Sequence, residues 1–165
     1  MTTIYTLTDS PVGELLLTGE RSADGTILTS LTMPDHPAIG ADWERDDRAF
    51  SEATRQLSAY FAGYLTHFEL PLAAEGTEFQ QRVWQALDSI PYGTTTTYGA
   101  LAERLGVPRA EVRALGAALG ANPLLLVRPC HRVIGADGSM RGYAAGIERK
   151  VQLLTHEGAL QPMLG

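Results

Sequence analysis

The hydrophobic and polar positions in the first part of the chain follow a pattern typical of strands. Residues 4–8 and 15–18 flank a turn-forming segment at 9–13, and residues 26–33 alternate between apolar and polar side chains. A period of two places alternate side chains on opposite faces of a strand. The pattern therefore predicts a hairpin and a third strand, followed by a loop over 34–41.

Helical spacing replaces this alternation in the next segment. Phe50, Thr54, Leu57 and Phe61 recur at intervals of three or four residues, and Gly63 follows them. Such spacing lines up side chains on one face of a helix, and glycine often follows a helix end. We therefore expect a small antiparallel sheet with one helix over residues 1–76, which carry no catalytic signature.

The second part of the chain predicts helices. Thr77 and Gln80 have the spacing of a capping box, which opens a helix. Three further helices follow from apolar spacing and from threonine or glycine at their ends, over residues 98–105, 110–119 and 147–156. Two short helices joined by a tight turn are typical of a helix-turn-helix, a motif that binds DNA or simply packs a core. We expect residues 77–165 to form a mainly α domain.

The charge of the chain is distributed unevenly between these two parts. The net charge is −6, but residues 1–77 carry 4 Arg and 12 acidic residues, whereas residues 78–165 carry 8 Arg, 1 Lys and 7 acidic residues. Arginine suits bidentate contacts with phosphate. The second part could therefore face a polyanion while the first part faces away.

The composition excludes several classes of protein. The length of 165 residues suits one domain or two small ones, and no apolar run reaches the ~20 residues that span a bilayer. The N-terminus does not resemble a signal peptide, so we expect a cytoplasmic protein. A single cysteine cannot form an internal disulfide. The four histidines are scattered along the chain, so we expect no metal site.

Cys130 is the candidate for chemistry. A single cysteine is either a small buried apolar residue or a nucleophile, and a nucleophile needs a nearby base or a positive field. His131 follows directly, and Pro129 restricts the backbone before the cysteine. In an extended chain neighbouring side chains point apart, so we expect a bridging water between thiol and imidazole. Glu157 is a candidate, by residue type, to orient the imidazole.

The segment PCHRVIG around Cys130 resembles the active-site signature of the O6-alkylguanine-DNA alkyltransferase family. Further segments match that family in order along most of the chain: DSPVG at 9–13, YFAG at 60–63, GTEFQ at 76–80, VW at 83–84, IPYG at 90–93, YG at 98–99, RALG at 113–116, NP at 122–123 and GY at 142–143. The resemblance implies a ribonuclease H-like N-terminal domain and a C-terminal domain with a winged helix-turn-helix. It also implies that Cys130 is the nucleophile.

The family's reaction would give the residues around Cys130 defined roles. Cys130 would attack the alkyl carbon and keep it as a thioether, so the resemblance implies no cofactor and a single turnover. His131, through water, and Glu157 would form the relay that activates the thiol. Asn122 would brace the turn before the active site through backbone hydrogen bonds.

The resemblance also implies a pocket for one guanine base. Tyr98 would donate a hydrogen bond to N3 of the base, and the carbonyls of Cys130 and Val133 would accept from its amino group. The backbone N–H of Ala144 would reach O6, and Tyr143 would wall the pocket. On residue type alone, the two tyrosines could equally be core aromatics.

The implied partner is double-stranded DNA containing O6-alkylguanine. A thiol cannot reach O6 inside a stacked duplex, so the nucleotide must be flipped out. Arg113 would fill the gap, and the small residues Ala114 and Gly116 would let the helix over 110–119 approach the minor groove. We expect a monomer in solution; cooperative binding to DNA stays open.

The chain departs from the family pattern in three ways. Between Tyr98 and Arg113 it holds one residue more than is usual, so Arg109 is a rival for the position in the DNA stack. Ala145 stands where glycine is common, which we interpret as a tighter pocket that disfavours benzyl-sized adducts. The N-terminal zinc ligands of some relatives are absent.

Three other functions are consistent with parts of the pattern. A non-catalytic protein that binds alkylated bases would lack the cysteine. A winged-helix transcriptional regulator would bind one DNA sequence and show no change in mass. A cysteine hydrolase using Cys130 and His131 would turn over small esters or amides, and would leave the helix-turn-helix unexplained.

Overall fold

The computed structural model describes residues 2–34 and 38–160 and divides into two compact units, Met1–Ala74 and Glu75–Gly165. Each unit has its own hydrophobic core. Among the described residues, no helix is long and apolar enough to cross a membrane.

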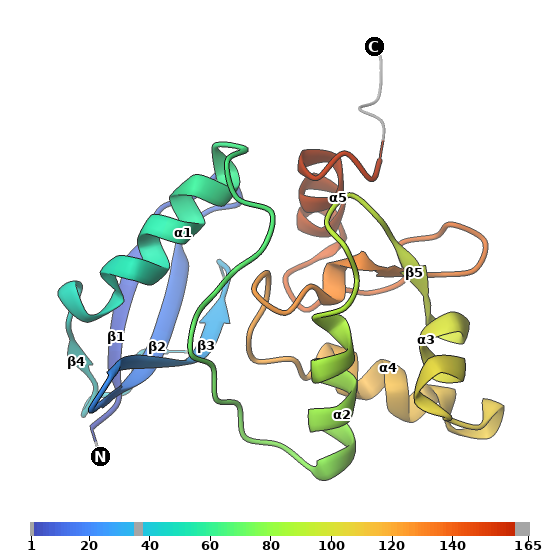
Figure 1. Ribbon diagram of the computed structural model, residues 1–165, viewed down its shortest axis with the longest axis horizontal. Coiled ribbons are helices and arrows are strands. Elements are labelled where there is room, and N and C mark those ends of the chain that lie inside the picture. Colours follow the sequence, from blue (N-terminus) through green and yellow to red (C-terminus); the bar gives the residue numbers. More distant parts are fainter. Residues whose placement is uncertain (1, 35–37, 161–165) are drawn as a thin grey trace. The chain divides into compact units, whose positions relative to one another are not determined.

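The first unit contains a four-stranded sheet in the order β3-β2-β1-β4 (Figure 1). The strands are β1 (Ile4–Thr8), β2 (Leu15–Ser22), β3 (Gly25–Thr32) and β4 (Glu44–Arg45). β1, β2 and β3 pair antiparallel, which confirms the hairpin and the third strand, although β2 continues beyond the expected residue 18. The two-residue strand β4 pairs parallel to β1 and is too short to show a period in the sequence.

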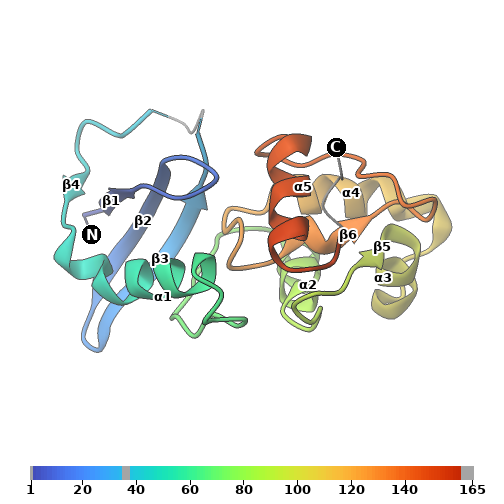
Figure 2. The same cartoon turned by 90° about the horizontal axis from the view of Figure 1, so that it is seen from above.

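One helix covers this sheet. α1 (Ser51–Phe61) follows a short 3₁₀ turn, η1 (Arg48–Phe50), and runs across one face of the sheet (Figure 2). Its buried residues Ala53, Leu57 and Tyr60 are spaced at helical intervals, as the sequence indicated. They belong to the same core as strand residues such as Ile4, Leu15, Leu17 and Leu31, each no more than 1% exposed.

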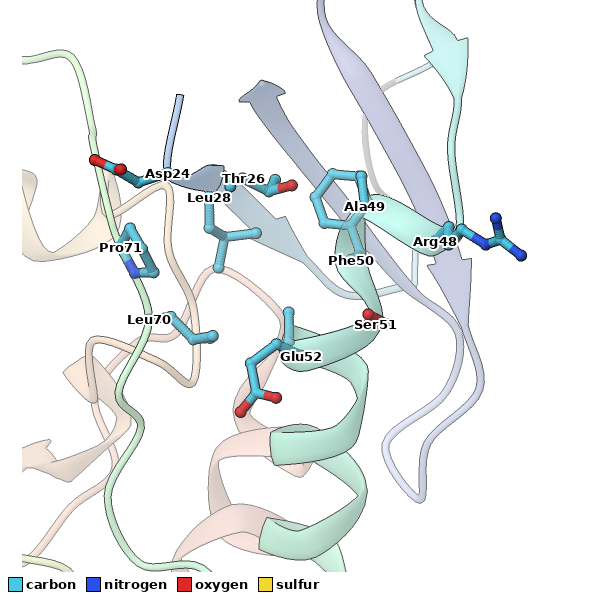
Figure 3. A pocket seen from close by; sticks show the side chains of 12 residues that line it. Asp24, Thr26, Leu28, Arg48, Ala49, Phe50, Ser51, Glu52, Leu70 and Pro71 are labelled. Carbon is cyan, nitrogen blue, oxygen red and sulfur yellow. The ribbon is translucent and has the colours of Figure 1, made fainter. Parts of the chain in front are cut away.

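A cavity of about 400 Å³ lies beside the sheet in this unit (Figure 3). It is formed by β3, by the start of α1 and by the segment around Pro71, which hydrogen-bonds to Leu28. The described residues that line it include Asp24, Arg48 and Glu52 but neither cysteine nor histidine. This cavity thus contains hydroxyl groups and charged side chains but neither a thiol nor an imidazole.

Within residues 75–160 the second unit contains four α-helices: α2 (Glu78–Leu87), α3 (Tyr98–Leu105), α4 (Val112–Gly120) and α5 (Ile147–His156). The capping box at the start of α2 is confirmed, because the Thr77 hydroxyl accepts from the Gln80 N–H and the Gln80 side chain accepts from the Thr77 N–H. The loop expected between residues 136 and 146 contains neither helix nor strand.

The helix-turn-helix differs from its prediction in one detail. α3 has the expected bounds, with Thr97 as its N-cap and Gly106 in the left-handed region at φ +70°. The helix expected from residue 110 instead begins as a 3₁₀ turn, η2 (Arg109–Glu111), before α4. The Glu111 N–H donates to the Pro108 carbonyl, which closes a tight turn where an α-helix was expected.

A parallel pair of two-residue strands, β5 (Thr96–Thr97) and β6 (Val133–Ile134), was not predicted. β5 ends where α3 begins, and β6 starts three residues after Cys130. This pairing therefore brings Tyr98 and the segment that follows Cys130 into one region of the unit.

The backbone around the cysteine corrects another expectation. Cys130–Arg132 form a 3₁₀ turn, η3, rather than the extended segment expected after Pro129. Proline removes only its own N–H donor, and the turn is closed by Arg132, whose N–H donates to the Pro129 carbonyl. Successive side chains of a 3₁₀ turn still point in different directions, so Cys130 and His131 do not face each other.

Candidate active site

Cys130 lines a cavity of about 240 Å³ in the second unit. The sulfur-bearing residue is 6% exposed, so it reaches the cavity from an otherwise buried position. The other lining residues come from α3, from α4 and from the loop before α5: Tyr98, Gly116, Leu119, Gly120, Gly142, Tyr143 and Ala144. Glycines on two sides leave the space in front of the thiol open, since a Cβ at Gly116, Gly120 or Gly142 would meet nothing within 4 Å.

The thiol is held in its neutral form before any substrate binds. Burial raises the pKa of Cys130 from 9.0 to about 11, although a hydrogen bond with Asn122 and the charge of Lys150 act in the opposite direction. Burial disfavours the charged form of an acid because the low-polarity interior solvates a thiolate poorly. A reaction at neutral pH therefore requires a group that removes the proton.

The sequence-based candidate for that group, His131, belongs to a buried ion network. Its Nε2 lies 2.9 Å from Oε2 of Glu157, and both side chains are fully buried. Arg132 donates to both carboxylate oxygens of Glu157, at 2.8 and 3.0 Å, and to the carbonyl of Ile90 at 2.6 Å. The guanidinium also lies 5.7 Å from the centre of the Tyr92 ring. This network fixes the plane of the imidazole.

The network also determines which nitrogen of His131 can accept a proton. Burial lowers the pKa of His131, although the neighbouring Glu157 carboxylate raises it, and the imidazole is neutral near pH 7. A neutral imidazole carries one proton, and the Glu157 carboxylate places it on Nε2. Nδ1 is then the acceptor; it is buried and has no hydrogen-bond partner among the described residues.

Asn122 holds the backbone before the cysteine. Its side-chain N–H donates to the carbonyl of Arg128 at 3.0 Å and, more weakly, to that of Leu124 at 3.4 Å. Its side-chain oxygen accepts from the Leu124 N–H at 3.0 Å. One buried amide thus closes the turn over residues 122–128 and also contacts the thiol of Cys130.

Lys150 ties the loop of the cavity to β6. Its ammonium donates to the carbonyls of Val133, Met140 and Gly142 at 2.7, 2.6 and 3.2 Å. The residue is 1% exposed, and burial lowers its pKa to about 8. The same ammonium that lowers the pKa of Cys130 therefore holds the loop that carries Tyr143.

Two tyrosines wall the cavity with neutral hydroxyl groups. Burial raises the pKa of both Tyr98 and Tyr143, so both remain hydrogen-bond donors at neutral pH. The Tyr143 hydroxyl is buried and unpaired among the described residues, and its ring meets His131 edge-on at 6.4 Å. Ala144 lines the cavity and is exposed.

The predicted DNA-facing residues lie on the outer side of α4. Arg113 and Ala114 are exposed, whereas Ala118 is buried and its carbonyl accepts from the Trp84 indole at 2.8 Å. The small residues of this helix therefore serve two faces, one open and one packed against α2. The second unit also has a second cavity, of about 520 Å³, beside Tyr98. Its other lining residues are Gly99, Arg109, Ala110, Val112, Arg113, Gly135, Ala136 and Arg141.

Most of the site residues expected from the sequence gather around Cys130, with two differences. Ala145 does not line the cavity; its carbonyl accepts from Arg149 at 3.0 Å. Arg132 and Lys150 were not identified from the sequence. Lys150 had one usable signal, because it is the only lysine in the chain. It also lies two helical turns before Glu157, on the face that carries Leu153 and Leu154.

The fold and the site define a two-unit protein in which a helix-turn-helix unit carries a single-cysteine site. Comparison with known families agrees with this division. Residues 3–74 match the model for the ribonuclease-like domain of 6-O-methylguanine DNA methyltransferase, and residues 78–159 match the model for the DNA binding domain of the same protein. The chain therefore belongs to the 6-O-methylguanine DNA methyltransferase family, which confirms the resemblance found in the sequence and the expected fold class.

Individual relatives match over nearly the full chain. The methylated-DNA–protein-cysteine methyltransferase of Mycolicibacterium paratuberculosis is 48% identical over 96% of this chain and 94% of its own length. That of Methanosarcina acetivorans is 44% identical, over 94% and 98%. The crystal structure of Mycobacterium tuberculosis OGT in complex with DNA has a TM-score of 0.85 at 47% identity, covering 94% of this chain and 93% of that one.

Proposed function

We propose that this protein repairs duplex DNA by moving the alkyl group of O6-alkylguanine onto Cys130. The observation that carries the proposal is a neutral thiol at the wall of a cavity of about 240 Å³, backed by a histidine with one unpaired nitrogen. The volume lies below the roughly 300–1,000 Å³ of pockets for larger ligands, which suits a single base. The similarity to methylated-DNA–protein-cysteine methyltransferases supports the substrate.

The reaction starts with removal of the thiol proton. His131 accepts this proton on Nδ1 through one bridging water, and Glu157, which Arg132 holds in place, stabilises the resulting imidazolium. The thiolate attacks the alkyl carbon in line, the sulfur–carbon bond forms, and the bond between carbon and O6 breaks. Guanine leaves as an anion and takes up a proton from solvent, His131 returns the thiol proton to solvent, and the thioether remains on Cys130. The protein is consumed one molecule per lesion, without a cofactor.

The cavity stabilises the departing base. The Tyr98 hydroxyl donates to N3 and reduces the cost of the negative charge on guanine, and the Ala144 N–H donates to O6. The carbonyls of Cys130 and Val133 accept from the amino group. The Val133 carbonyl already accepts from Lys150 at 2.7 Å, and a carbonyl oxygen has a second lone pair for this purpose. Tyr143 forms the wall opposite the base.

The helix α4 presents this site to DNA. We assign it to the minor groove, where the exposed Ala114 and the half-exposed Gly116 permit close approach. Arg113 fills the space left by the flipped nucleotide; Arg109, which lines the same cavity, is its rival. Residues 77–165 perform the reaction, and residues 1–76 support them. A thiol that must stay reduced to react also favours a cytoplasmic location.

Mass spectrometry tests the proposal directly. The protein is incubated with duplex DNA that contains one O6-methylguanine, and the tryptic peptide over residues 114–132 is weighed. We expect a gain of one methylene group, at one per protein, that is absent in Cys130→Ser. Lesion binding without a mass gain would instead show a non-catalytic binding protein. Binding of one DNA sequence without a mass gain would show a regulator. Multiple turnovers of small esters would show a hydrolase.

A further inference from the structure

The second cavity, of about 520 Å³ beside Tyr98, is lined by three arginines that form no ion pair with a carboxylate among the described residues. Arg109, Arg113 and Arg141 are all exposed. Three guanidinium groups around one cavity repel each other, and a bound anion would relieve that repulsion. Guanidinium groups present donors that match phosphate oxygens.

This cavity adjoins the one that contains Cys130. Tyr98 lines both cavities, so a molecule that occupies one reaches the other across a single side chain. If a base enters the Cys130 cavity, its sugar and phosphate must remain outside at the shared wall. The cavity of the three arginines lies at that wall.

Arg141 belongs to the loop that forms the Cys130 cavity, whereas Arg109 and Arg113 belong to η2 and α4. Arg141 has φ +60°, and its side chain lies over Gly135, where an added Cβ would come within 2.6 Å of Nε. The Asp137 carboxylate accepts from the Ser139 N–H at 3.0 Å and interacts electrostatically with Arg141, but forms no ion pair with it. The loop thus presents a positioned cation to the shared wall, two residues before Tyr143.

We propose that Arg141 binds a phosphate next to the flipped nucleotide and so couples the lesion-pocket loop to the DNA backbone. Arg109 faces the same phosphate from the other side of the cavity. This inference rests on the proposed function, and it assigns to Arg141 a contact with DNA rather than with the alkylated base. Arg141 is therefore needed for a substrate that carries phosphates and dispensable for a free base.

Two substrates separate these roles. Single-turnover rates are measured with duplex DNA containing O6-methylguanine and with free O6-benzylguanine, which has no phosphate. We expect Arg141→Gln to slow the reaction with DNA about tenfold. The slope of log rate against log salt concentration should also become smaller by about one, the value for one phosphate contact. The rate with the free base should stay within about twofold of the wild type, and Arg141→Lys should regain part of the loss with DNA.

The exposed arginine Arg48 supplies the matched control. It lies in the first unit, carries the same charge and has no ion-pair partner among the described residues, so Arg48→Gln should change neither rate. If Arg141→Gln slowed both substrates equally, the residue would only shape the loop, and the proposal would be wrong. It would be equally wrong if Arg141→Gln behaved like Arg48→Gln.

Neutral phosphate analogues locate the contact. A methylphosphonate is placed at the linkage on the 5′ or the 3′ side of the lesion. At one of these linkages, the methylphosphonate should slow the wild type as much as Arg141→Gln slows the reaction on normal DNA. The same methylphosphonate should not slow Arg141→Gln any further. Additive losses at both linkages would overturn the proposal. A wild-type protein that transfers no alkyl group from either substrate would instead overturn the proposed function.

Discussion

Buried polar groups differ in kind between the two units. In Met1–Ala74 the buried polar residues are neutral. The Gln56 amide donates to the Glu69 carbonyl and accepts from the Glu69 N–H, whereas Thr6 and Thr18 hydrogen-bond to other side chains. In Glu75–Gly165 most of them are ionisable, namely Arg128, His131, Arg132, Lys150 and Glu157. Buried charge is expensive unless it is paired. The first unit thus buries neutral groups that link strands and loops, whereas the second concentrates ionisable groups around Cys130.

The two units also use surface charge differently. Three of the four arginines of the first unit, Arg21, Arg45 and Arg55, form ion pairs with acidic neighbours at the surface, and only Arg48 has none among the described residues. The cavity arginines of the second unit have no such partners among the described residues. Unpaired cations remain available to a ligand, and paired ones do not. The difference in charge between the two parts of the sequence is therefore increased in the fold, because most arginines of the first unit are paired with carboxylates and those of the second cavity are not.

The largest expected effect comes from removing the charge of the buried Glu157 carboxylate in the second unit. Glu157→Gln leaves Arg132 buried without its counter-charge and weakens the orientation of His131. We expect alkyl transfer to fall at least a hundredfold and the free energy of unfolding to drop by about 3 kcal/mol. Single-turnover kinetics and urea denaturation measure both quantities.

Glu52→Gln is the control for this change. Glu52 is exposed, and its ion pair with Arg55 lies on the surface of α1, so neither stability nor transfer should change measurably. If the two substitutions changed the transfer rate and the free energy of unfolding equally, the buried position of Glu157 would not be the cause of its effect.

An effect of similar size, but on the labelling of the thiol and without loss of stability, is expected from the protonation of Cys130. Because the thiolate is the reactive form and the pKa of the folded protein is about 11, labelling by iodoacetamide should rise with pH about tenfold per unit between pH 7 and 10. In urea the thiol returns to its ordinary pKa near 9, so labelling at pH 7 should be about a hundredfold faster than in the folded state. Mass spectrometry of the labelled peptide measures both rates. Labelling of the folded protein that is already constant above pH 7 would contradict a neutral resting thiol.

The smallest effect concerns adduct size. Ala145 does not line the cavity, so its methyl group can act only through the position of the loop next to Tyr143 and Ala144. We expect the wild type to react more slowly with O6-benzylguanine than with O6-methylguanine when both are presented in DNA. Ala145→Gly should narrow this ratio by a few-fold. If the wild type reacted with the two adducts at comparable rates, the interpretation of Ala145 as a sign of a tighter pocket would be wrong.

The parts of the fold that the sequence predicted are those determined by local signals. The Thr77 capping box and the Gly106 helix end act within a few residues, and both appear as expected. The strands β5 and β6 contain two residues each, too few to show a period. The 3₁₀ turn at Cys130 was also missed, because the preceding proline indicated extended backbone.

The candidate site could be predicted only in part for a related reason. Cys130 and His131 are adjacent in the sequence, so a motif identifies them together. Glu157 could be named by type, but only the fold brings its carboxylate to 2.9 Å from the imidazole across 26 residues of sequence. Arg132 and Lys150 were missed because a sequence does not show that a cation is buried.

The scarcity of lysine has a consequence for how the proposed DNA-facing surface can be controlled. Lys150 is the only lysine in the chain and is buried, so the basic side chains around the second cavity are all arginine. Arginine stays protonated throughout the physiological range and is not a target of lysine acetyltransferases. The positive potential of that cavity is therefore permanent: neither a shift in cellular pH nor acylation of side-chain amines can switch it off.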